Sequence, residues 1–168
     1  RCNTVAGTGG GYVWTLRVDG YAAVLDDMPP MRYEAASIRA ITGAGANVRS
    51  GSTQGGDIVY LEGSGFGPPQ IERDARYGRI DWPVERWFNA SACVVIPGAR
   101  FADDTRVRCT TVAGVGASLH WQLLGDDGRH SPISSANATT AYAQPTITTF
   151  SGEARHATTT RGGEVITI

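Results

Sequence analysis

The stretch from Arg108 to Leu124, RCTTVAGVGASLHWQLL, decides the fold, because its last six residues alternate in chemical class. Apolar side chains recur at Leu119, Trp121 and Leu123, which is the period of a β-strand with one buried face. The chain opens on a closely similar phrase, RCNTVAGTGGGYVWTLR, displaced by 107 residues. Because the three positions stay apolar in both copies, we expect them to face the core in both. In the first copy they hold Tyr12, Trp14 and Leu16.

Two further pairs of stretches lie about one period apart, in the same order along the chain. YEAASIRAITG from Tyr33 is echoed by YAQPTITTFSG from Tyr142 at an offset of 109, and GGDIVYL from Gly55 by GGEVITI from Gly162 at 107. A period of about 107 residues is the size of a small domain rather than of a solenoid turn. We therefore expect a tandem repeat, seen as a window on a longer array or as a protomer completed by its neighbours. The C-terminal part of one module is expected over 1–32, a complete module over 33–141, and the first strands of a third over 142–168.

Composition and charge exclude several classes of protein. With 41% hydrophobic residues, 18% charged residues, 22 glycines and 8 prolines, the chain is expected to be globular and rich in turns. The net charge of −1 gives no electrostatic footprint for nucleic acid or for an anionic membrane surface. No apolar run approaches the roughly 20 residues of a membrane span. We expect neither nucleic-acid binding nor membrane insertion from this segment.

An all-β fold is predicted, because no stretch of ten residues shows helical periodicity while period-two alternation recurs between Gly, Pro and Asp clusters. Val59 and Leu61 should point inward, as should their counterparts Ile166 and Ile168. Seven short strands separated by turns suggest a β-sandwich of immunoglobulin type. A helical turn is expected within Pro68 to Arg79. The predicted strands are Ser37 to Ile41, Asp57 to Glu62, Gly78 to Trp82, Ala92 to Ile96, Thr105 to Thr110, Leu119 to Leu124 and Thr139 to Ala143.

Several ordered motifs carry a family resemblance over nearly the whole of Ala36 to Thr149. These are GGDIVYLEGSGFGP, CVVIPGARFADDTRVRCTTVAGVGASLHWQLLGDDGRHS, TTAYAQPTI and PTITTFSG. Together they resemble the IPT/TIG domain (immunoglobulin-like, plexins, transcription factors), especially the tandem copies in very large secreted or surface proteins of algae and other protists. The resemblance implies an immunoglobulin-like β-sandwich of the E-set type, located outside the cell. Ala36 departs from the family by replacing the usual proline before the first strand.

The three cysteines bear on the compartment of the protein. Cys93 and Cys109 lie on two predicted strands and should both point inward, and a cysteine pair is frequent here in the family. A disulfide between them would stabilise the module by roughly 3 kcal/mol. The alternative is two buried free thiols in a reducing compartment. Cys2 matches Cys109, so its partner is expected outside this segment.

Two sequons and one aromatic cluster are the remaining candidate sites. Asn89 in NAS and Asn137 in NAT lie beside predicted turns or strand ends, where covalent glycans could project. The aromatic cluster has two interpretations: it packs a loop onto the sandwich, or, if exposed, it forms an interaction patch between modules or chains. Its members are Tyr77, Trp82, Trp87 and Phe88.

Catalytic, metal and cofactor sites are not expected. The three histidines form no metal-ligand spacing with any cysteine. The paired carboxylates Asp26-Asp27, Asp103-Asp104 and Asp126-Asp127 fall at turns without a wider set of oxygen ligands. GSGFG from Gly63 lacks the lysine of a P-loop and the helix that a dinucleotide site needs.

The sequence therefore predicts a non-catalytic, extracellular, structural or adhesive segment, part of a surface fibre or filament. Its partners are expected to be neighbouring modules of the same chain or identical chains, joined by strand addition at open sheet edges. The alternative is a ligand- or glycan-binding module of a receptor ectodomain.

Overall fold

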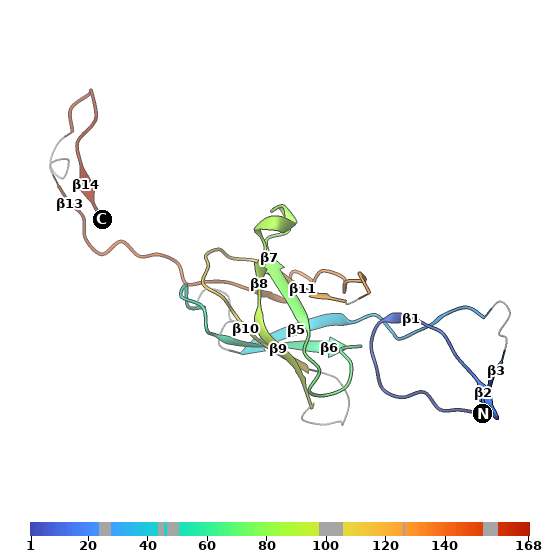
Figure 1. Cartoon of the computed structure of the whole chain (residues 1–168). Coiled ribbons are helices and arrows are strands. Elements are labelled where there is room, and N and C mark those ends of the chain that lie inside the picture. The colour runs from blue at the N-terminus through green and yellow to red at the C-terminus, as the bar shows by residue number, and fades with distance from the viewer. Residues whose placement is uncertain (24–27, 44–45, 47–50, 98–105, 126, 153–157) are drawn as a thin grey trace.

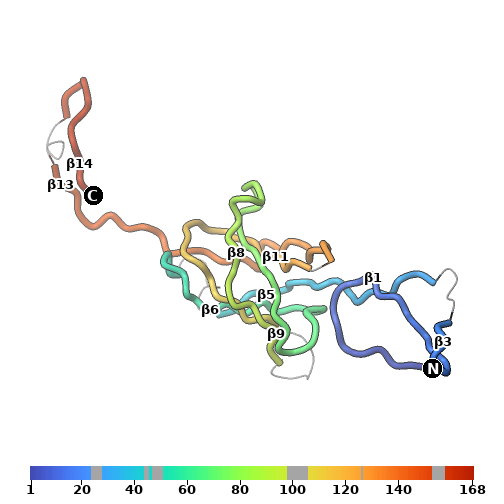
Figure 2. The backbone as a smooth tube through the Cα atoms, in the orientation of Figure 1, coloured from blue at the N-terminus to red at the C-terminus, as the bar shows by residue number. Residues whose placement is uncertain are grey.

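The computed structural model describes residues 1–23, 28–43, 46, 51–97, 106–125, 127–152 and 158–168. A central body of strands carries an N-terminal segment on one side and a C-terminal hairpin on the other, so the two termini lie at opposite ends (Figure 1). The chain leaves the body as a single extended connection before it reaches that hairpin (Figure 2). Within the described ranges the regular structure is strand, apart from one three-residue 3-10 helix, so the predicted all-β class is confirmed.

The central body consists of two four-stranded antiparallel sheets. Their strand orders are β5-β6-β10-β9 and β12-β11-β7-β8. The strands are β5 Ser37–Gly43, β6 Ile58–Ser64, β7 Asp74–Gly78, β8 Phe88–Asn89, β9 Ser91–Ile96, β10 Arg106–Thr110, β11 Leu119–Leu124 and β12 Thr139–Thr140.

Alternation along the strands builds the core between the two sheets. Val59 and Leu61 of β6 are fully buried, as predicted, and their sheet contributes Val107 of β10 to the same cluster. Trp121 of β11 lies opposite them as one of the largest fully buried side chains. One hydrophobic cluster therefore joins both inner faces, which is the arrangement of a β-sandwich. The body extends to Tyr142, which is also buried in this cluster, one residue past the expected boundary.

Two elements differ from prediction in the region before β8. The predicted strand Gly78 to Trp82 is wrong, because β7 ends at Gly78 and the chain then turns. The predicted helical turn within Pro68 to Arg79 is also wrong, because β7 occupies the end of that range. Ala75 and Tyr77 alternate inward there, so the real signal was a period of two. The helical turn comes later, at the 3-10 helix η1 Val84–Arg86, directly after a proline that fixes φ at −61°.

The two flanking segments form short ladders of their own. In the N-terminal segment, β1 Gly10–Tyr12 pairs with β4 Met31–Arg32, and β2 Arg17–Val18 pairs with β3 Tyr21–Ala22. In the C-terminal hairpin, β13 Ser151–Gly152 pairs with β14 Ile166–Thr167. Among the described residues, no second sheet packs against any of these three ladders.

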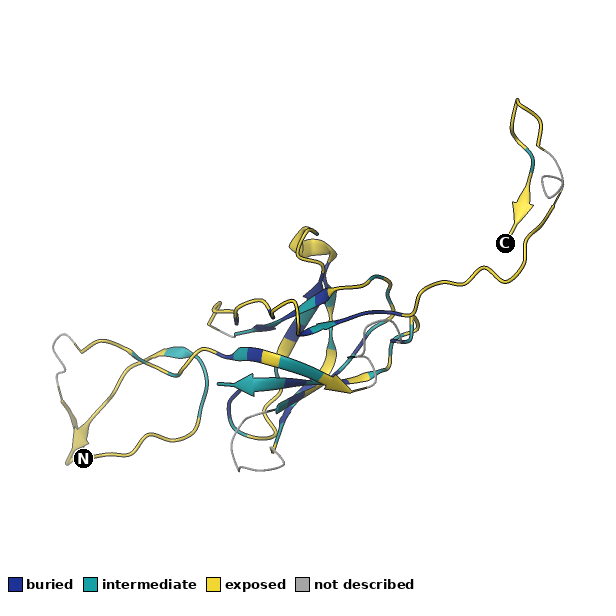
Figure 3. Cartoon of the chain, turned by 180° about the vertical axis from the view of Figure 1, so that it is seen from behind, coloured by how far each residue is buried: buried dark blue, intermediate teal, exposed yellow. Residues whose placement is uncertain are grey.

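The expectation that the apolar faces of the flanking segments are buried is wrong. Tyr12 is 47%, Trp14 41% and Leu16 56% exposed, whereas their counterparts in β11 are buried. Figure 3 shows the same contrast, with buried ribbon concentrated in the body and exposed ribbon in both flanks. Burial needs a second layer, and in the described part of the chain the body alone has one. Ile166 and Ile168 are likewise exposed.

Candidate interaction sites

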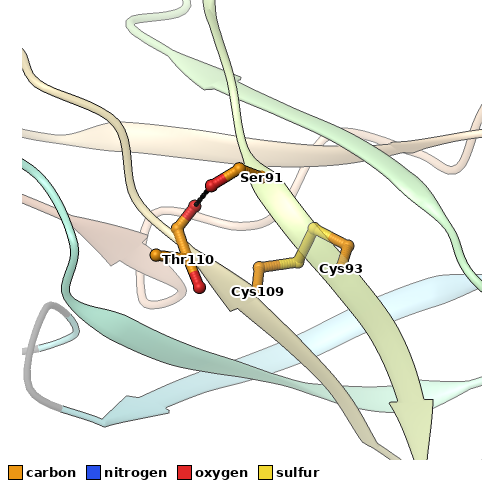
Figure 4. Close-up of a disulfide and its surroundings, with 4 residues drawn as sticks. All are labelled: Ser91, Cys93, Cys109 and Thr110. Carbon is orange, nitrogen blue, oxygen red and sulfur yellow. Dashed lines mark hydrogen bonds between the residues drawn. A yellow bond between two sulfur atoms is a disulfide. The ribbon is translucent and has the colours of Figure 1, made fainter.

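Cys93 and Cys109 form a disulfide inside the core, between neighbouring strands of one sheet (Figure 4). The register of β9 against β10 shifts between Arg108 and Thr110, and Ala92 has a positive φ of 48°. This bulge brings Cys93 beside Cys109, with the Cα atoms 4.0 Å apart. The link therefore fastens one sheet rather than joining the two layers. Of the three cysteines, Cys2 is free and exposed.

Both sequon asparagines are exposed and lie near opposite edges of the sheet β12-β11-β7-β8. Asn89 is the last residue of the edge strand β8, and Asn137 lies in a turn two residues before the edge strand β12. Neither side chain donates or accepts a hydrogen bond among the described residues. Each position therefore offers a free amide pointing to solvent beside an open strand.

The aromatic cluster does not form an exposed patch. Tyr77 is fully buried and Trp87 is 8% exposed, while Trp82 and Phe88 are partly buried against the core. The interpretation that these side chains pack the loop onto the sandwich is therefore the one that the structure supports. The reason is the position of β7: its inward alternation carries Tyr77 into the core, and the loop after it folds back over the same sheet.

A tyrosine pair at the centre of the body was missed by sequence reasoning. The hydroxyl groups of Tyr77 and Tyr142 lie 2.6 Å apart, and the Tyr142 hydroxyl donates to the Val112 carbonyl at 2.5 Å. The Val112 amide donates to the Tyr77 hydroxyl at 2.9 Å. Burial raises the pKa of both tyrosines. The available signal was the repeat itself, because Tyr142 is the counterpart of Tyr33.

The N-terminal segment repeats that arrangement one period earlier. The Tyr33 hydroxyl donates to the Val5 carbonyl at 2.6 Å, and these two residues are the counterparts of Tyr142 and Val112. The ladder repeats as well: Tyr12 pairs with Met31, just as their counterparts in β11 and β12 pair with each other. The two registers are Tyr12↔Met31 and Leu119↔Thr140.

The C-terminal hairpin repeats the pairing of β5 with β6. Gly152 faces Ile166 there, and its counterpart Gly43 faces Val59. Both glycines have positive φ, 108° for Gly43 and 119° for Gly152, and a side chain at either would collide with a backbone carbonyl oxygen of the facing strand. The same local geometry therefore occurs in the hairpin as in the body.

An apolar cavity of about 320 Å³ lies within the N-terminal segment, against Tyr12, Trp14 and Tyr33. The counterparts of three of its lining residues contact Tyr77 in the body, namely Val112, Trp121 and Tyr142. There, Tyr77 stacks on Trp121 with ring centroids 4.3 Å apart. The cavity thus has the position beside Trp14 that Tyr77 fills beside Trp121.

A second cavity, also of about 320 Å³, lies where the N-terminal segment meets the body. Its walls are of mixed polar and apolar character, and Arg32, Arg73 and Arg129 are among the residues that line it. Arg73 donates from Nη1 to the Thr8 hydroxyl at 3.2 Å, which ties the segment to the body.

Among the described residues, no group of three or more His, Cys, Asp or Glu side chains is placed to hold a metal ion. Asp26-Asp27, Asp103-Asp104 and Asp126 lie outside the described residues, and Asp127 sits 3.9 Å from Arg129. In the same part of the chain, no helix has the length and apolar character needed to cross a membrane.

Comparison with known proteins assigns the body to a family. No curated protein and no solved structure matches the chain. The family model for the IPT/TIG domain matches residues 46–142, more than half of the 168 residues. The matched range contains the disulfide, both sequons and the paired hydroxyl groups of Tyr77 and Tyr142. The chain therefore belongs to the IPT/TIG domain family.

Proposed function

We propose that the chain is a segment of a tandem array of IPT/TIG modules, with a non-catalytic structural or adhesive role outside the cell. The repeated register carries this proposal. Tyr12↔Met31 matches Leu119↔Thr140 on one side of the body, and Gly152↔Ile166 matches Gly43↔Val59 on the other. Recurrence of sequence and pairing at one domain-sized period is the expected signature of repeated modules.

Neighbouring modules, of the same chain or of identical chains, are the partners that fit the exposed apolar faces. A strand equivalent to β7 would add to the open edge beside Trp14 and place a tyrosine in the apolar cavity, as Tyr77 sits beside Trp121. Strand addition satisfies the edge hydrogen bonds and buries the apolar face together. Repeated along an array, it would build a surface fibre or filament.

The disulfide and the two exposed sequons support an extracellular setting. The disulfide between Cys93 and Cys109 belongs to the chemistry of oxidising compartments. Asn89 and Asn137 are both exposed and free to accept glycans.

Glycans at the two sequons would stand beside β8 and β12, the two edge strands of one sheet, and would prevent strand pairing at those edges. Assembly would then be directed to the ends of the module.

The array is tested by mass spectrometry of natively isolated protein, with and without glycosidase treatment. We expect a Cys93–Cys109 peptide, hexose on Asn89 or Asn137, and peptides that continue past Ile168 into another GSGFG-like stretch. An unglycosylated chain with free thiols that ends at Ile168 would contradict the proposal.

Strand completion is tested separately by adding a synthetic peptide of residues 72–90 to the protein and following tryptophan indole signals by NMR. We expect the Trp14 signal to shift with saturation while that of the buried Trp121 stays unchanged. The same peptide with Tyr77→Ala should have little effect, because it lacks the ring that fills the cavity. Equal shifts with both peptides, or none, would exclude this mode of joining.

A further inference from the structure

The cavity between the N-terminal segment and the body has the chemistry of a ligand site. Thr8, Gly9 and Gly10 of the segment line it together with Arg73, which lies just before β7. A Cβ atom at Gly10 would come within 3.1 Å of Arg129 Nη1, so glycine leaves room for that side chain in the cavity wall. Its volume of about 320 Å³ is within the range of small-molecule sites.

Arg73 is a half-buried cation without a counter-ion among the described residues. Its Nη1 bonds to the neutral Thr8 hydroxyl, and its Nε is buried with no hydrogen-bond partner. The ion pairs of the described chain involve other arginines. A buried N–H group that lacks an acceptor is costly, and an anion held beside Arg73 in the cavity would compensate that cost.

Two more arginines increase the positive charge of the cavity. Arg32 lines it without an ion pair among the described residues, and Arg129 lines it beside Asp127, with 3.9 Å between Nε and the carboxylate. Guanidinium groups bind carboxylate or sulfate through paired hydrogen bonds. The cavity is therefore suited to an anionic group.

The remaining walls restrict which anion fits. Asp127 and Glu34 also line the cavity, and their carboxylates would repel a bare anion but accept hydrogen bonds from hydroxyl groups. Tyr12, which is exposed, adds apolar surface that can lie against the carbon atoms of a ring. An anionic group, several hydroxyl groups and an apolar ring face together describe an acidic sugar.

We propose that this cavity binds an acidic pyranose, a uronate or a sulfated hexose, with its anionic group on Arg73 and its hydroxyl groups on Asp127. This inference goes beyond the structural role and stands whether or not the modules form an array. Because the cavity lies at the junction between the N-terminal segment and the body, a bound sugar would also stiffen that junction.

The test is a calorimetric titration of the whole chain with a galacturonate disaccharide, the matching neutral galactose disaccharide and sodium sulfate. We expect saturable binding of the galacturonate disaccharide only, weakened about tenfold or more by Arg73→Gln, the loss of one charged hydrogen bond. Arg108→Gln is the matched control, because Arg108 is exposed and points away from the core on β10. No binding of the acidic disaccharide, or equal binding of the neutral one, overturns the proposal.

A second variant separates a sugar site from a simple anion site. Asp127→Asn should weaken binding of the galacturonate disaccharide, because the Asp127 carboxylate would accept hydrogen bonds from its hydroxyl groups, and sodium sulfate should show no saturable binding to either protein. Sulfate that binds the native protein as tightly as the disaccharide would show an inorganic anion site and overturn the sugar assignment. Asp127→Asn lies on the surface, so it also serves if Arg73→Gln disturbs folding.

Discussion

The Tyr77 and Tyr142 hydroxyl groups lie 2.6 Å apart in the core and share the backbone of Val112 as a partner. Tyr77 comes from β7, and Tyr142 is the last residue of the body. Their contact fastens the end of the module to its central sheet. The same hydrogen bond in the N-terminal segment joins Tyr33 to Val5, but no described residue there corresponds to Tyr77, and an apolar cavity lies against Tyr33.

Replacing Tyr142 with phenylalanine should destabilise the body by about 1–3 kcal/mol, because the Val112 carbonyl and the Tyr77 hydroxyl each lose a buried partner. Urea denaturation gives the free energy of unfolding. Tyr60→Phe is the matched control, since Tyr60 lies on the outer face of β6 and packs beneath Arg106. A Tyr142→Phe variant as stable as the Tyr60→Phe variant would contradict this role.

Alkaline conditions should destabilise the body through the same pair. Burial raises the pKa of Tyr77 and Tyr142 in the folded state, while the unfolded chain titrates near 10.0. A raised folded pKa gives stability that is fully present below pH about 10 and is lost as the pH rises further. The free energy of unfolding should therefore be flat from pH 7 to 9 and fall above about 10. The decline should be shallower in Tyr142→Phe, and an identical decline would assign it to other groups.

Removing the disulfide should lower the free energy of unfolding by roughly 3 kcal/mol, because Cys93 and Cys109 close a loop with a sequence separation of 16. The comparison is the Cys93→Ala/Cys109→Ala variant against Cys2→Ala, which removes only an exposed thiol. Thermal unfolding of both, with and without reductant, measures the effect. If reductant lowers the midpoint of the double variant as much as that of the native protein, the disulfide is not the cause.

Lowering the pH should remove a small contribution of Glu62 to the free energy of unfolding. Hydrogen bonds from Arg106 and Thr42 lower the pKa of this carboxyl below its ordinary 4.5. Its stabilising effect is therefore present above pH 4.5 and is lost as the pH falls through the lower folded value. Since both partners of the ion pair are about a third exposed, we expect less than about 1 kcal/mol. Glu62→Gln should flatten the acid side of the stability profile, and Glu85→Gln on the exposed η1 should leave it unchanged.

The alternation of apolar residues was sufficient to place most of the sandwich. It located β6, β10 and β11, because each has one face in the core and one outside, so burial is written directly into the sequence. It failed around β7, where the charged residues Arg73 and Arg76 obscure the inward pair Ala75 and Tyr77. Local pattern cannot show that a polar-looking segment is covered by another layer.

For the candidate sites too, the sequence predicted some features and could not predict others. The pairing of Cys93 with Cys109 could be anticipated from strand facing and family resemblance. The bulge at Ala92, which brings the two cysteines side by side, could not, because it depends on how β9 meets β10. The aromatic cluster was ambiguous in sequence, since Tyr77 and Trp87 are equally suited to a core or to a contact surface.

The sequence by itself determined the class, the strands with one buried face and the repeat, because these depend on residue type and spacing along the chain. Only the tertiary structure decided which of two similar patterns is buried: Trp121 lies under a second sheet, and Trp14 does not. It alone brought Thr8 to Arg73, 65 residues apart, and so formed the arginine-lined cavity. Burial and charge pairing depend on which surfaces meet in space, and the separation of two residues along the chain does not predict whether they meet.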